Sequence, residues 1–524
     1  MSDCLIPRIN GTRTDLGGSV HFPNTVNIIN TAFPEWTCEA FLSRTRRTAG
    51  KDGFSLRLER DSALPQEGCS LRVTHEGAVL KASSENGILH ALTTLACLAR
   101  EGSLPCCEIQ DAPRFPHRGL SLDCVRHFFP AEEVKKIIEE MSLVKMNVLH
   151  WHLSDDQGWR IESKRFPKLN ETGGPFYTQE EIADIVDFSR KRGIVIIPEI
   201  DLPGHVSAIL AAFPEYSCSG QQVDIAKSGG IFPIILCPGK ESTFTFLEDL
   251  LSEVSPLFPG SLFHIGGDEA PKSEWRKCPY CQKRIREEGL SGEEELQGYF
   301  MRRTAKMLPE KQPVCWNETL LSSAPPENAV IQYWTPAHAK SMAKYAEKGG
   351  RWIWSDMFGL YFDYPYSMTP VKKVYEARPV IGEEDHSGDT GLLGMECALW
   401  TEHIADAEKL ETRLFPRLQA LAENCWSGTG DYGEFKARLK ANMPAAVSRG
   451  AAWTSEDWWD PEGEARLAEA LGYLKAMREG LDPAVLQETM QAAAPDPGFA
   501  RIFAARFFRP EDVPILMKAF AGTL

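Results

Sequence analysis

Eight short strand-like segments between residues 118 and 400 constrain the fold of this chain more than any other feature. They are residues 118–124, 147–153, 194–201, 262–269, 313–318, 329–334, 351–356 and 392–400. Helix-like segments lie between several of them, for example residues 130–146 and 178–192. Strands that alternate with helices pair in parallel through right-handed crossovers. Eight such units over about 300 residues predict a closed (β/α)8 TIM barrel.

An open, doubly wound sheet is the alternative architecture for alternating strands and helices. Such a sheet is expected to carry a glycine-rich phosphate-binding loop after its first strand. In this chain the first predicted strand is followed by Asp123-Cys-Val-Arg126, which contains no glycine. We therefore expect the closed barrel.

The sequence before the predicted barrel has a different character. Residues 54–59 and 71–74 alternate apolar and polar side chains, as half-exposed strands do. Residues 85–100 place apolar side chains on one side of a helix. Prolines within residues 110–116 interrupt both helix and strand, so this segment is expected to be a linker. The N-terminal part is thus predicted to be a small α+β domain.

The sequence after the predicted barrel is helical. Leu467, Leu471, Leu474 and Met477 have near-helical spacing, and we expect this apolar stripe to pack against the outer barrel helices. A capping or dimerising element is the alternative. The predicted class is therefore α/β, with a TIM barrel between a small α+β domain and a helical C-terminal extension. The expected boundaries are residues 1–112, 113–445 and 446–524.

The acidic balance of the chain limits its partners. Its net charge is −16, and no clustered Lys and Arg residues are present to bind phosphates, so nucleic acid is not an expected partner. No window approaches the roughly 18 apolar residues of a membrane span. Residues 1–20 contain polar and charged side chains where a signal peptide needs an apolar core. We expect the chain as given to be cytoplasmic, or secreted or periplasmic if a signal peptide was removed from it.

The cysteines point weakly to a metal. Fourteen cysteines in 524 residues are too sparse for a disulfide scaffold. Cys278 and Cys281 form a CxxC pair, which could join Cys218 and Cys237 as a four-thiolate structural zinc site. One CxxC without a second is weak evidence, so free thiols are expected and neither a metal nor a cofactor is predicted.

Charged and aromatic side chains follow every predicted strand. In chain order they are Asp123, Arg126 and His127; His150, His152, Asp155 and Asp156; Glu199, Asp201 and His205; Asp268 and Glu269; Trp316 and Glu318; Trp334; Tyr361 and Asp363; and Trp400 and Glu402. The carboxyl ends of the strands meet at one face of a TIM barrel, where active sites lie. We therefore expect these side chains to surround one cleft.

The adjacent acids Asp268 and Glu269 are the strongest candidates for chemistry. Two glycines, Gly266 and Gly267, precede them and allow the backbone to bend sharply. At such a bend both acids can face one cleft, where a carboxyl pair suits general acid and base catalysis on an acetal. The alternative is a helix N-terminus, where acidic residues are also favoured, because residues 272–288 could be helical.

Other strand-end residues suit a sugar ligand. Trp316, Trp334 and Trp400 could form aromatic walls for the apolar face of a sugar ring. The guanidinium of Arg126 offers several donors to hydroxyl groups. Asp201 and His205 could support the acid pair or form a buried pair of their own.

Seven motifs resemble those of glycoside hydrolase family 20, the β-N-acetylhexosaminidases, and occur in the same order. They are RGLSLDCVRHFF (118–129), HWHLSDDQGWR (150–160), PEIDLPGH (198–205), HIGGDE (264–269), YFD (361–363), GMECALWTE (394–402) and RLFPRLQALAE (413–423). Several long motifs in order are much more specific than one short pattern. The resemblance spans roughly residues 50–430, including the small α+β domain that precedes the barrel in this family.

The resemblance implies a role for each candidate residue. Glu269 would be the general acid and then the base, and Asp268 would orient the 2-acetamido group of the substrate. The carbonyl oxygen of that group would attack the anomeric carbon and form an oxazolinium intermediate. The remaining implied contacts are Tyr361 to the acetamido carbonyl; Arg126, Asp363 and Glu402 to ring hydroxyls; Trp316, Trp334 and Trp400 as pocket walls; and Asp155, Asp201 and His205 as supports of the acid pair.

The expected function is that of an exo-acting, retaining β-N-acetylhexosaminidase without a cofactor. Its partner would be a glycan with a terminal N-acetylglucosamine or N-acetylgalactosamine. A lacto-N-biosidase of the same family, a non-catalytic glycan-binding barrel and a barrel hydrolase with its own nucleophile are the alternatives. Sugar preference, linkage and oligomeric state cannot be read from the sequence.

Overall fold

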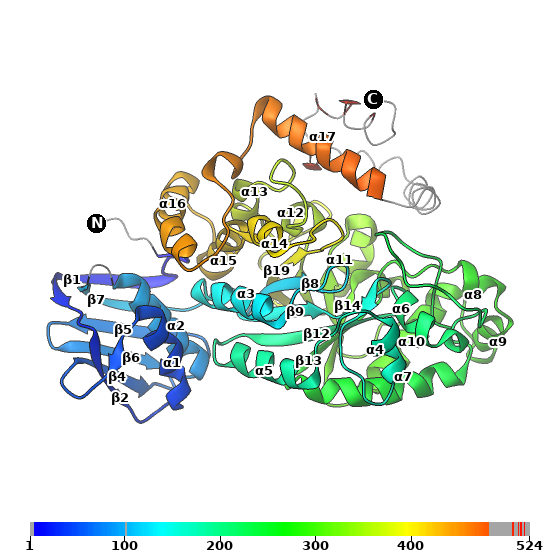
Figure 1. The fold of residues 1–524 in the computed structure, drawn as a ribbon, viewed down its shortest axis with the longest axis horizontal. Helices are drawn as coiled ribbons and strands as arrows, with labels where there is room; N and C mark the ends of the chain where they lie inside the picture. The colour runs from blue at the N-terminus through cyan, green and yellow to red at the C-terminus, as the bar shows by residue number, and fades with distance from the viewer. Residues whose placement is uncertain are drawn as a thin grey trace.

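The eight predicted strands close into one parallel barrel in the computed structural model, which describes residues 5–99 and 102–480 together with residues 506, 507, 512, 514, 515 and 518 (Figure 1). In order around the barrel the strands are β8 (His117–Asp123), β9 (Val148–His152), β12 (Val195–Leu202), β13 (Leu262–Gly266), β14 (Gln312–Trp316), β15 (Val330–Tyr333), β16 (Arg351–Trp354) and β19 (Leu392–Leu399). β19 pairs in parallel with β8 and closes the ring. The TIM-barrel prediction is confirmed.

Several strands end earlier than predicted, and this places polar side chains at the mouth of the barrel. The predicted run 262–269 ends as a strand at Gly266, and the run 313–318 ends at Trp316. Asp268, Glu269 and Glu318 therefore follow their strands, and their backbones are free of the ladder geometry that would point neighbouring residues to opposite faces.

Helices surround the barrel. They include α3 (Ala131–Leu143), α5 (Gln179–Arg190), α7 (Glu241–Val254), α10 (Glu293–Lys306), α11 (Ala339–Glu347), α14 (Ala407–Leu414) and α15 (Arg417–Ser427). The sequence fixes the start of α5 by a capping box, in which the Thr178 hydroxyl accepts from the Glu181 N–H and the Glu181 carboxylate accepts from the Thr178 N–H. Ile182 and Ile185 are buried on its inner face.

The interior of the barrel contains an aliphatic layer and a polar layer. At its lower end, five aliphatic side chains pack together, from Val148, Ile197, Val314, Val330 and Ile353. Above them lies a buried polar layer that contains His150, Glu199, His264, Gln332 and Glu396. This order places apolar filling where no ligand enters and polar groups toward the mouth.

The N-terminal part is a seven-stranded sheet with two helices beside it. The strand order is β1 (Gly11–His21), β7 (Ser103–Asp111), β5 (Cys69–Thr74), β6 (Gly77–Ala82), β4 (Phe54–Arg60), β2 (Thr25–Asn30) and β3 (Thr48–Ala49), and the helices are α1 (Glu39–Thr45) and α2 (Glu85–Leu98). The α+β prediction is confirmed, although the sequence analysis did not identify β1, β2, β3 and β7. β7 also includes the first residues of the predicted linker.

Buried ion pairs join this sheet to the lower end of the barrel. The Lys145 ammonium lies 2.7 Å from the Asp111 carboxylate of β7, and Arg118 of β8 lies 2.7 Å from Glu67. The indole N–H of Trp426 also donates to Asp111, at 2.8 Å. Arg118 lies at the start of β8 and Lys145 precedes β9, so the sheet covers the end of the barrel opposite to the mouth.

Up to residue 480, two α-helices follow the barrel, α16 (Tyr432–Ser448) and α17 (Gly463–Gly480), and most of the predicted helical extension beyond them lies outside the described residues. The expected apolar stripe of α17 does pack inward, with Leu474 buried and Leu467 and Leu471 partly buried. Its partners are not the outer barrel helices that the sequence suggested. They are Met357 and Phe358 of α12 (Met357–Leu360), together with Tyr361 and Tyr364, which follow β16 at the mouth.

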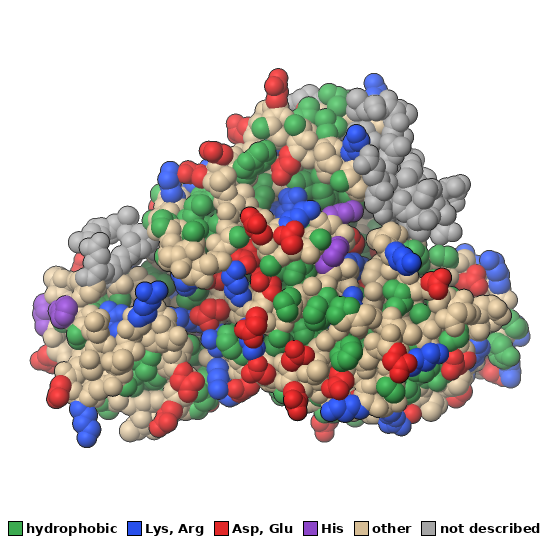
Figure 2. Space-filling view, viewed as in Figure 1, with side chains coloured by type: hydrophobic (Ala, Val, Ile, Leu, Met, Phe, Trp, Pro, Cys, Tyr) green, Lys and Arg blue, Asp and Glu red, His purple; other side chains and the backbone are tan. Residues whose placement is uncertain are grey.

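Within the described residues, no helix combines the length and the apolar character needed to cross a bilayer. On the face shown in Figure 2, acidic and basic side chains are interspersed.

We predict that Asp111→Ala lowers the free energy of unfolding by about 3–5 kcal/mol, because Lys145 would be left buried without its partner. Denaturant unfolding followed by circular dichroism measures the change. The control is Glu108→Ala on the same strand, whose ion pair with Arg72 is exposed and is worth at most about 1 kcal/mol. Equal losses in both variants would contradict the role given to the buried pair.

Candidate active site

The two acids face one site because of the backbone between β13 and the next helix. Gly266 and Gly267 have φ of 69° and 107°, in the left-handed region that favours glycine. The side chains of the two acids converge on one imidazole. Nε2 of His205 lies 3.7 Å from Oδ2 of Asp268 and 3.5 Å from Oε2 of Glu269. The next helix, α8 (Ser273–Lys277), has Lys272 at its N-cap. The pair therefore does not cap a helix, and that alternative is wrong.

The backbone around the pair is held in an uncommon conformation. Glu269 and His205 have φ of 45° and 52°, although neither is glycine. Such conformations cost roughly 1–3 kcal/mol each and are found where a site fixes its side chains. Gly266 also sits so close to Asp201 that a Cβ added there would lie 1.7 Å from the Asp201 carboxylate. Only glycine allows this approach.

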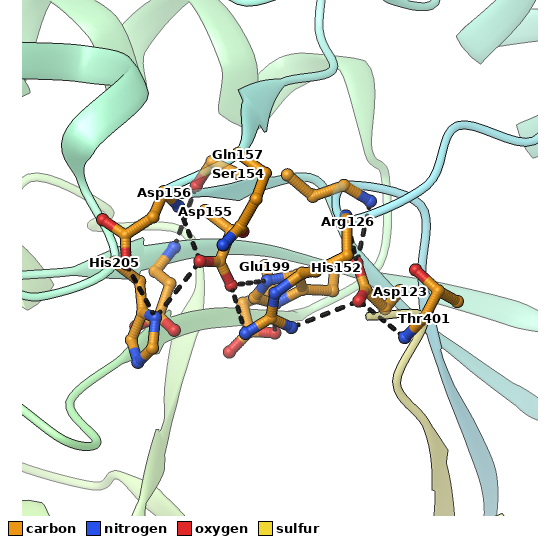
Figure 3. Close-up of polar contacts among 12 residues, drawn as sticks. Asp123, Arg126, His152, Ser154, Asp155, Asp156, Gln157, Glu199, His205 and Thr401 are labelled. Atoms are coloured by element: carbon orange, nitrogen blue, oxygen red, sulfur yellow. Dashed lines mark hydrogen bonds and ion pairs between the residues drawn. The ribbon is translucent and has the colours of Figure 1, made fainter. Parts of the chain in front are cut away.

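Asp155 links His205 to Arg126, as Figure 3 shows. It lies on β10 (Ser154–Asp155), directly after β9. Its Oδ1 is 3.1 Å from Nδ1 of His205, and its Oδ2 is 2.8 Å from both Nη2 of Arg126 and Nε2 of His152. Burial alone would raise the pKa of Asp155, but Arg126 and His205 hold it well below its usual value. Asp155 is therefore ionised, and its carboxylate orients the side chains of Arg126, His152 and His205.

Asp155 also controls the protonation of His205. Burial would lower the pKa of the imidazole, but the Asp155 carboxylate outweighs burial and raises that pKa well above its usual value. The protonated ring can then face the Asp268 and Glu269 carboxyls with its Nε2–H. Asp155 therefore keeps His205 protonated, so that a positively charged ring lies beside the acid pair.

The acids at the centre of the site have raised pKa values. Burial raises the pKa of Asp268 to about 6, with Glu269 adding to the effect and His205 opposing it. Burial and the neighbouring Asp268 also raise the pKa of Glu318 to about 8 and that of Asp201 well above its usual value. Closely spaced carboxyls cannot all be ionised, so the group shares protons at neutral pH.

The two members of the pair differ in exposure. The Asp268 side chain is 14% exposed and that of Glu269 is 31% exposed. Asp268 therefore lies deeper, beside Asp201, while Glu269 stands closer to the opening. This difference allows the two carboxyls to serve different parts of one ligand.

The predicted aromatic residues form a continuous wall. Ring centroids lie 6.0 Å apart for Trp316 and Trp400, 6.0 Å for Trp400 and Tyr361, and 6.2 Å for Tyr361 and Trp334, whose rings are stacked. The indole N–H of Trp334 donates to Glu318 at 2.8 Å, which fixes the ring. Aromatic rings with a few fixed polar groups are typical of a small-ligand pocket.

The other end of the site carries donors and acceptors suited to hydroxyl groups. The Arg126 guanidinium lies 3.7 Å from Glu402 and over the Trp400 ring, at 5.1 Å from its centroid. Burial and Glu402 raise the pKa of Asp363 to about 8. Among the described site residues, the buried polar atoms without a hydrogen-bond partner include Nε of Arg126, Oδ1 of Asp268 and Oδ1 of Asp363. Buried polar groups are normally satisfied, so these atoms are available to a polar ligand.

The structure thus brings the predicted site residues together from all eight strand ends. Glu318, after β14, and His152, at the end of β9, were expected at the cleft as strand-end residues, but no role was assigned to them. The structure adds one residue that was not predicted there. Tyr473 of α17 stacks edge-on against Tyr364, with centroids 5.9 Å apart, and nothing in the sequence connected it to the barrel mouth.

Some of these groups lie close enough to share a metal ion, for example His152, Asp155 and Asp201. The two nitrogens of His152 are already bonded to Asp155 and Glu199. Both ring nitrogens of His152 are therefore occupied, and the chemistry of the group is that of carboxyls and imidazoles.

Two sequence models of one family match the chain. The model described as glycosyl hydrolase family 20, catalytic domain, matches residues 115–429, and that described as glycosyl hydrolase family 20, domain 2, matches residues 7–112. The second match begins well before residue 50, where the resemblance by motifs was expected to begin.

Curated relatives and solved structures agree with this match. The chain is 35% identical over 426 residues to a beta-hexosaminidase of Porphyromonas gingivalis and 34% identical over 406 residues to one of Vibrio furnissii, covering 74% and 70% of this chain. It spans 55% and 66% of the length of these relatives.

A Vibrio harveyi GH20 exo beta-N-acetylglucosaminidase in complex with N-acetylglucosamine superposes with a TM-score of 0.78 at 28% identity, covering 87% of this chain and 79% of that one. A Bacteroides fragilis beta-N-acetylhexosaminidase gives a TM-score of 0.77 at 29% identity, covering 86% and 96%.

We predict that Gly266→Ala destabilises the protein more than Gly349→Ala does. Both glycines have positive φ, so each substitution carries a backbone cost of roughly 1–2 kcal/mol. No atom lies within 4 Å of a Cβ at Gly349, whereas one at Gly266 would collide with Asp201. The overlap adds about 1–3 kcal/mol. Denaturant unfolding of both variants measures the difference, and equal losses would contradict the close approach.

Proposed function

Because the chain belongs to glycosyl hydrolase family 20, we propose that it is an exo-acting, retaining β-N-acetylhexosaminidase. It removes terminal N-acetylglucosamine or N-acetylgalactosamine from glycans. The named activities of its relatives and the bound N-acetylglucosamine of the Vibrio harveyi neighbour support this proposal.

One observation carries the proposal: two adjacent acids of unequal depth converge on the His205 imidazole. Glu269, the more exposed, donates its proton to the glycosidic oxygen as the bond from that oxygen to the anomeric carbon breaks. Asp268, the deeper acid, accepts a hydrogen bond from the acetamido N–H and holds the group against the sugar ring. The acetamido carbonyl oxygen then forms the new bond to the anomeric carbon, in place of a protein nucleophile.

The second step restores the enzyme. A water molecule attacks the anomeric carbon of the oxazolinium intermediate, and Glu269, now ionised, takes its proton. The bond to the carbonyl oxygen breaks, and the sugar leaves with its original configuration after two inversions. His205 faces both acids and stabilises their negative charge through this cycle.

The remaining contacts hold the terminal sugar. The wall of Trp316, Trp334, Trp400 and Tyr361 covers the apolar face of the ring and surrounds the acetamido group. The unpartnered atoms of Arg126 and Asp363, with Glu402 beside them, bind ring hydroxyls. Asp155 and Asp201 support the acid pair from behind.

The proposal is tested with two reporters that differ only at C2, an aryl N-acetyl-β-glucosaminide and the corresponding aryl β-glucoside. The acetamido oxygen acts as an intramolecular nucleophile, and such groups have effective molarities of about 10⁵ M or more. We expect kcat/KM for the glucoside to be lower by several orders of magnitude. Comparable rates on both would indicate a protein nucleophile, and no phenol release from either would indicate a non-catalytic barrel.

Glu269→Gln is the control variant for the acid. It should reduce turnover by roughly 10²–10⁴-fold on a glycoside with a poor leaving group, and much less on an activated aryl glycoside, which needs no proton. Release of monosaccharide measures both rates. A loss that is independent of the leaving group would contradict the role of Glu269 as acid.

We also predict an acidic limb in the pH profile of kcat/KM. Asp268 must be ionised to accept from the acetamido N–H, and its pKa is raised to about 6. Activity should therefore fall as the pH decreases through about 6. In Asp268→Asn the limb should disappear from the remaining activity, because no carboxylate is left to titrate there. An unchanged limb in the variant would assign it to another group.

A further inference from the structure

Four cysteine sulfurs meet beside the mouth of the barrel. Cys218 follows a short 3-10 helix (Pro214–Tyr216), and Cys237 lies at the far end of the same loop, before α7. Cys278 and Cys281 flank the start of α9 (Pro279–Glu287). All four sulfurs lie within 4.8 Å of one another. We propose that Cys218, Cys237, Cys278 and Cys281 form a structural zinc site.

The distances between the sulfurs fit a tetrahedral zinc. Cys218 and Cys281 are separated by 3.7 Å, Cys237 and Cys278 by 3.7 Å, and Cys237 and Cys281 by 3.6 Å. A tetrahedron with Zn–S bonds of about 2.3 Å has edges of about 3.8 Å. Disulfide-bonded sulfurs lie about 2.0 Å apart, so the spacing fits thiolates around an ion and not disulfides.

The surroundings favour four thiolates. Cys278 is the N-cap of α9 and Cys281 lies in its first turn, where the helix dipole stabilises negative charge. The backbone N–H of Gly239 donates to the Cys237 sulfur. Cys237, Cys278 and Cys281 are buried in a small cluster with Ile235, Trp275 and Leu296, separate from the main core. Four thiolates without a counter-ion would repel one another in such a setting, and a divalent cation removes that cost.

This proposal departs from the sequence expectation of free thiols. One CxxC was visible in the sequence, but Cys218 and Cys237 are separated by a long loop and do not resemble a second pair. The fold brings this loop against the segment after β13, where the indole N–H of Trp275 donates to the Leu236 carbonyl at 2.9 Å.

The position of the site indicates what the zinc holds. The loop between Cys218 and Cys237 runs to the active site, where the Ala226 N–H donates to the Asp156 carbonyl at 3.0 Å and the Gln157 amide donates to the Ser228 carbonyl at 2.8 Å. Gly229 lies against the Glu402 side chain. On the other side, Ala270, next to Glu269, packs on the cysteine cluster. Zinc would join this loop to the segment that carries the acid pair.

The role is structural and not catalytic. Four protein thiolates complete the coordination of zinc and leave no position for water or substrate. The site is also independent of the proposed glycosidase activity, because it contains none of the residues assigned to that reaction.

The test is the metal content of the full-length protein, purified without chelators from zinc-supplemented cells. Mass spectrometry of the metals should find about one zinc per chain, released by a mercurial reagent that binds thiols. Cys278→Ser and Cys281→Ser should each lose most of the zinc and unfold at a lower temperature. Cys106→Ser, which changes a buried cysteine in the N-terminal sheet, should retain it.

If the variants do not fold, a spectroscopic measurement on the unmutated protein tests the proposed zinc site. Cobalt exchanged into the site should show the thiolate charge-transfer and visible bands of tetrahedral cobalt bound by four sulfurs. Absence of metal with four reactive thiols after denaturation, two disulfides among these cysteines, or iron in place of zinc would each overturn the proposal.

Discussion

The buried carboxylate of Glu199 organises the upper half of the barrel. Glu199 has no exposed surface, and its carboxylate accepts a hydrogen bond from Nε1 of Trp316 at 2.9 Å and is hydrogen-bonded to Nδ1 of His152. Nδ1 of His264 and Nε2 of His150 also lie close to it, at 2.9 Å and 3.1 Å. A buried charge costs several kcal/mol unless it is paired and hydrogen-bonded. The two hydrogen-bonded side chains come from β9 and β14, so satisfying one carboxylate of β12 fixes the rotation of side chains on two other strands. The protein therefore builds its site on a polar layer and not on an aliphatic core.

Hydrogen bonds and ion pairs connect this buried polar layer to the residues at the mouth of the barrel. His152 bonds to Glu199 with one nitrogen and to Asp155 with the other, and Asp155 holds both Arg126 and His205. A residue with a single partner could turn in its pocket, whereas each member of this chain has at least two. The consequence is that the acid pair and Arg126 keep a fixed relation although they follow different strands. Preorganised polar groups of this kind act on a ligand without a reorganisation cost.

The mouth of the barrel is completed by segments outside the regular strand–helix repeat. The C-terminal helix α17 packs on Phe358, Tyr361 and Tyr364 and brings Tyr473 beside the site. The cysteine cluster joins a long loop after β12 to the segment after β13. The lower end, by contrast, is covered by the N-terminal sheet through buried ion pairs. The lower end of the barrel is thus closed by the N-terminal sheet, and the mouth carries the candidate active site.

The sequence alone determined the barrel and the chemical character of its mouth. Strand and helix periodicity is local, and polar residues that end apolar runs can be counted without coordinates, so Asp268, Glu269, Arg126 and the tryptophans could be predicted. Only the tertiary structure decided how these groups are charged and what else reaches them. The pKa values of Asp268 and Glu318, the contact of Tyr473 and the meeting of four cysteines all depend on distances between segments that are far apart in the chain, and no local pattern encodes such distances.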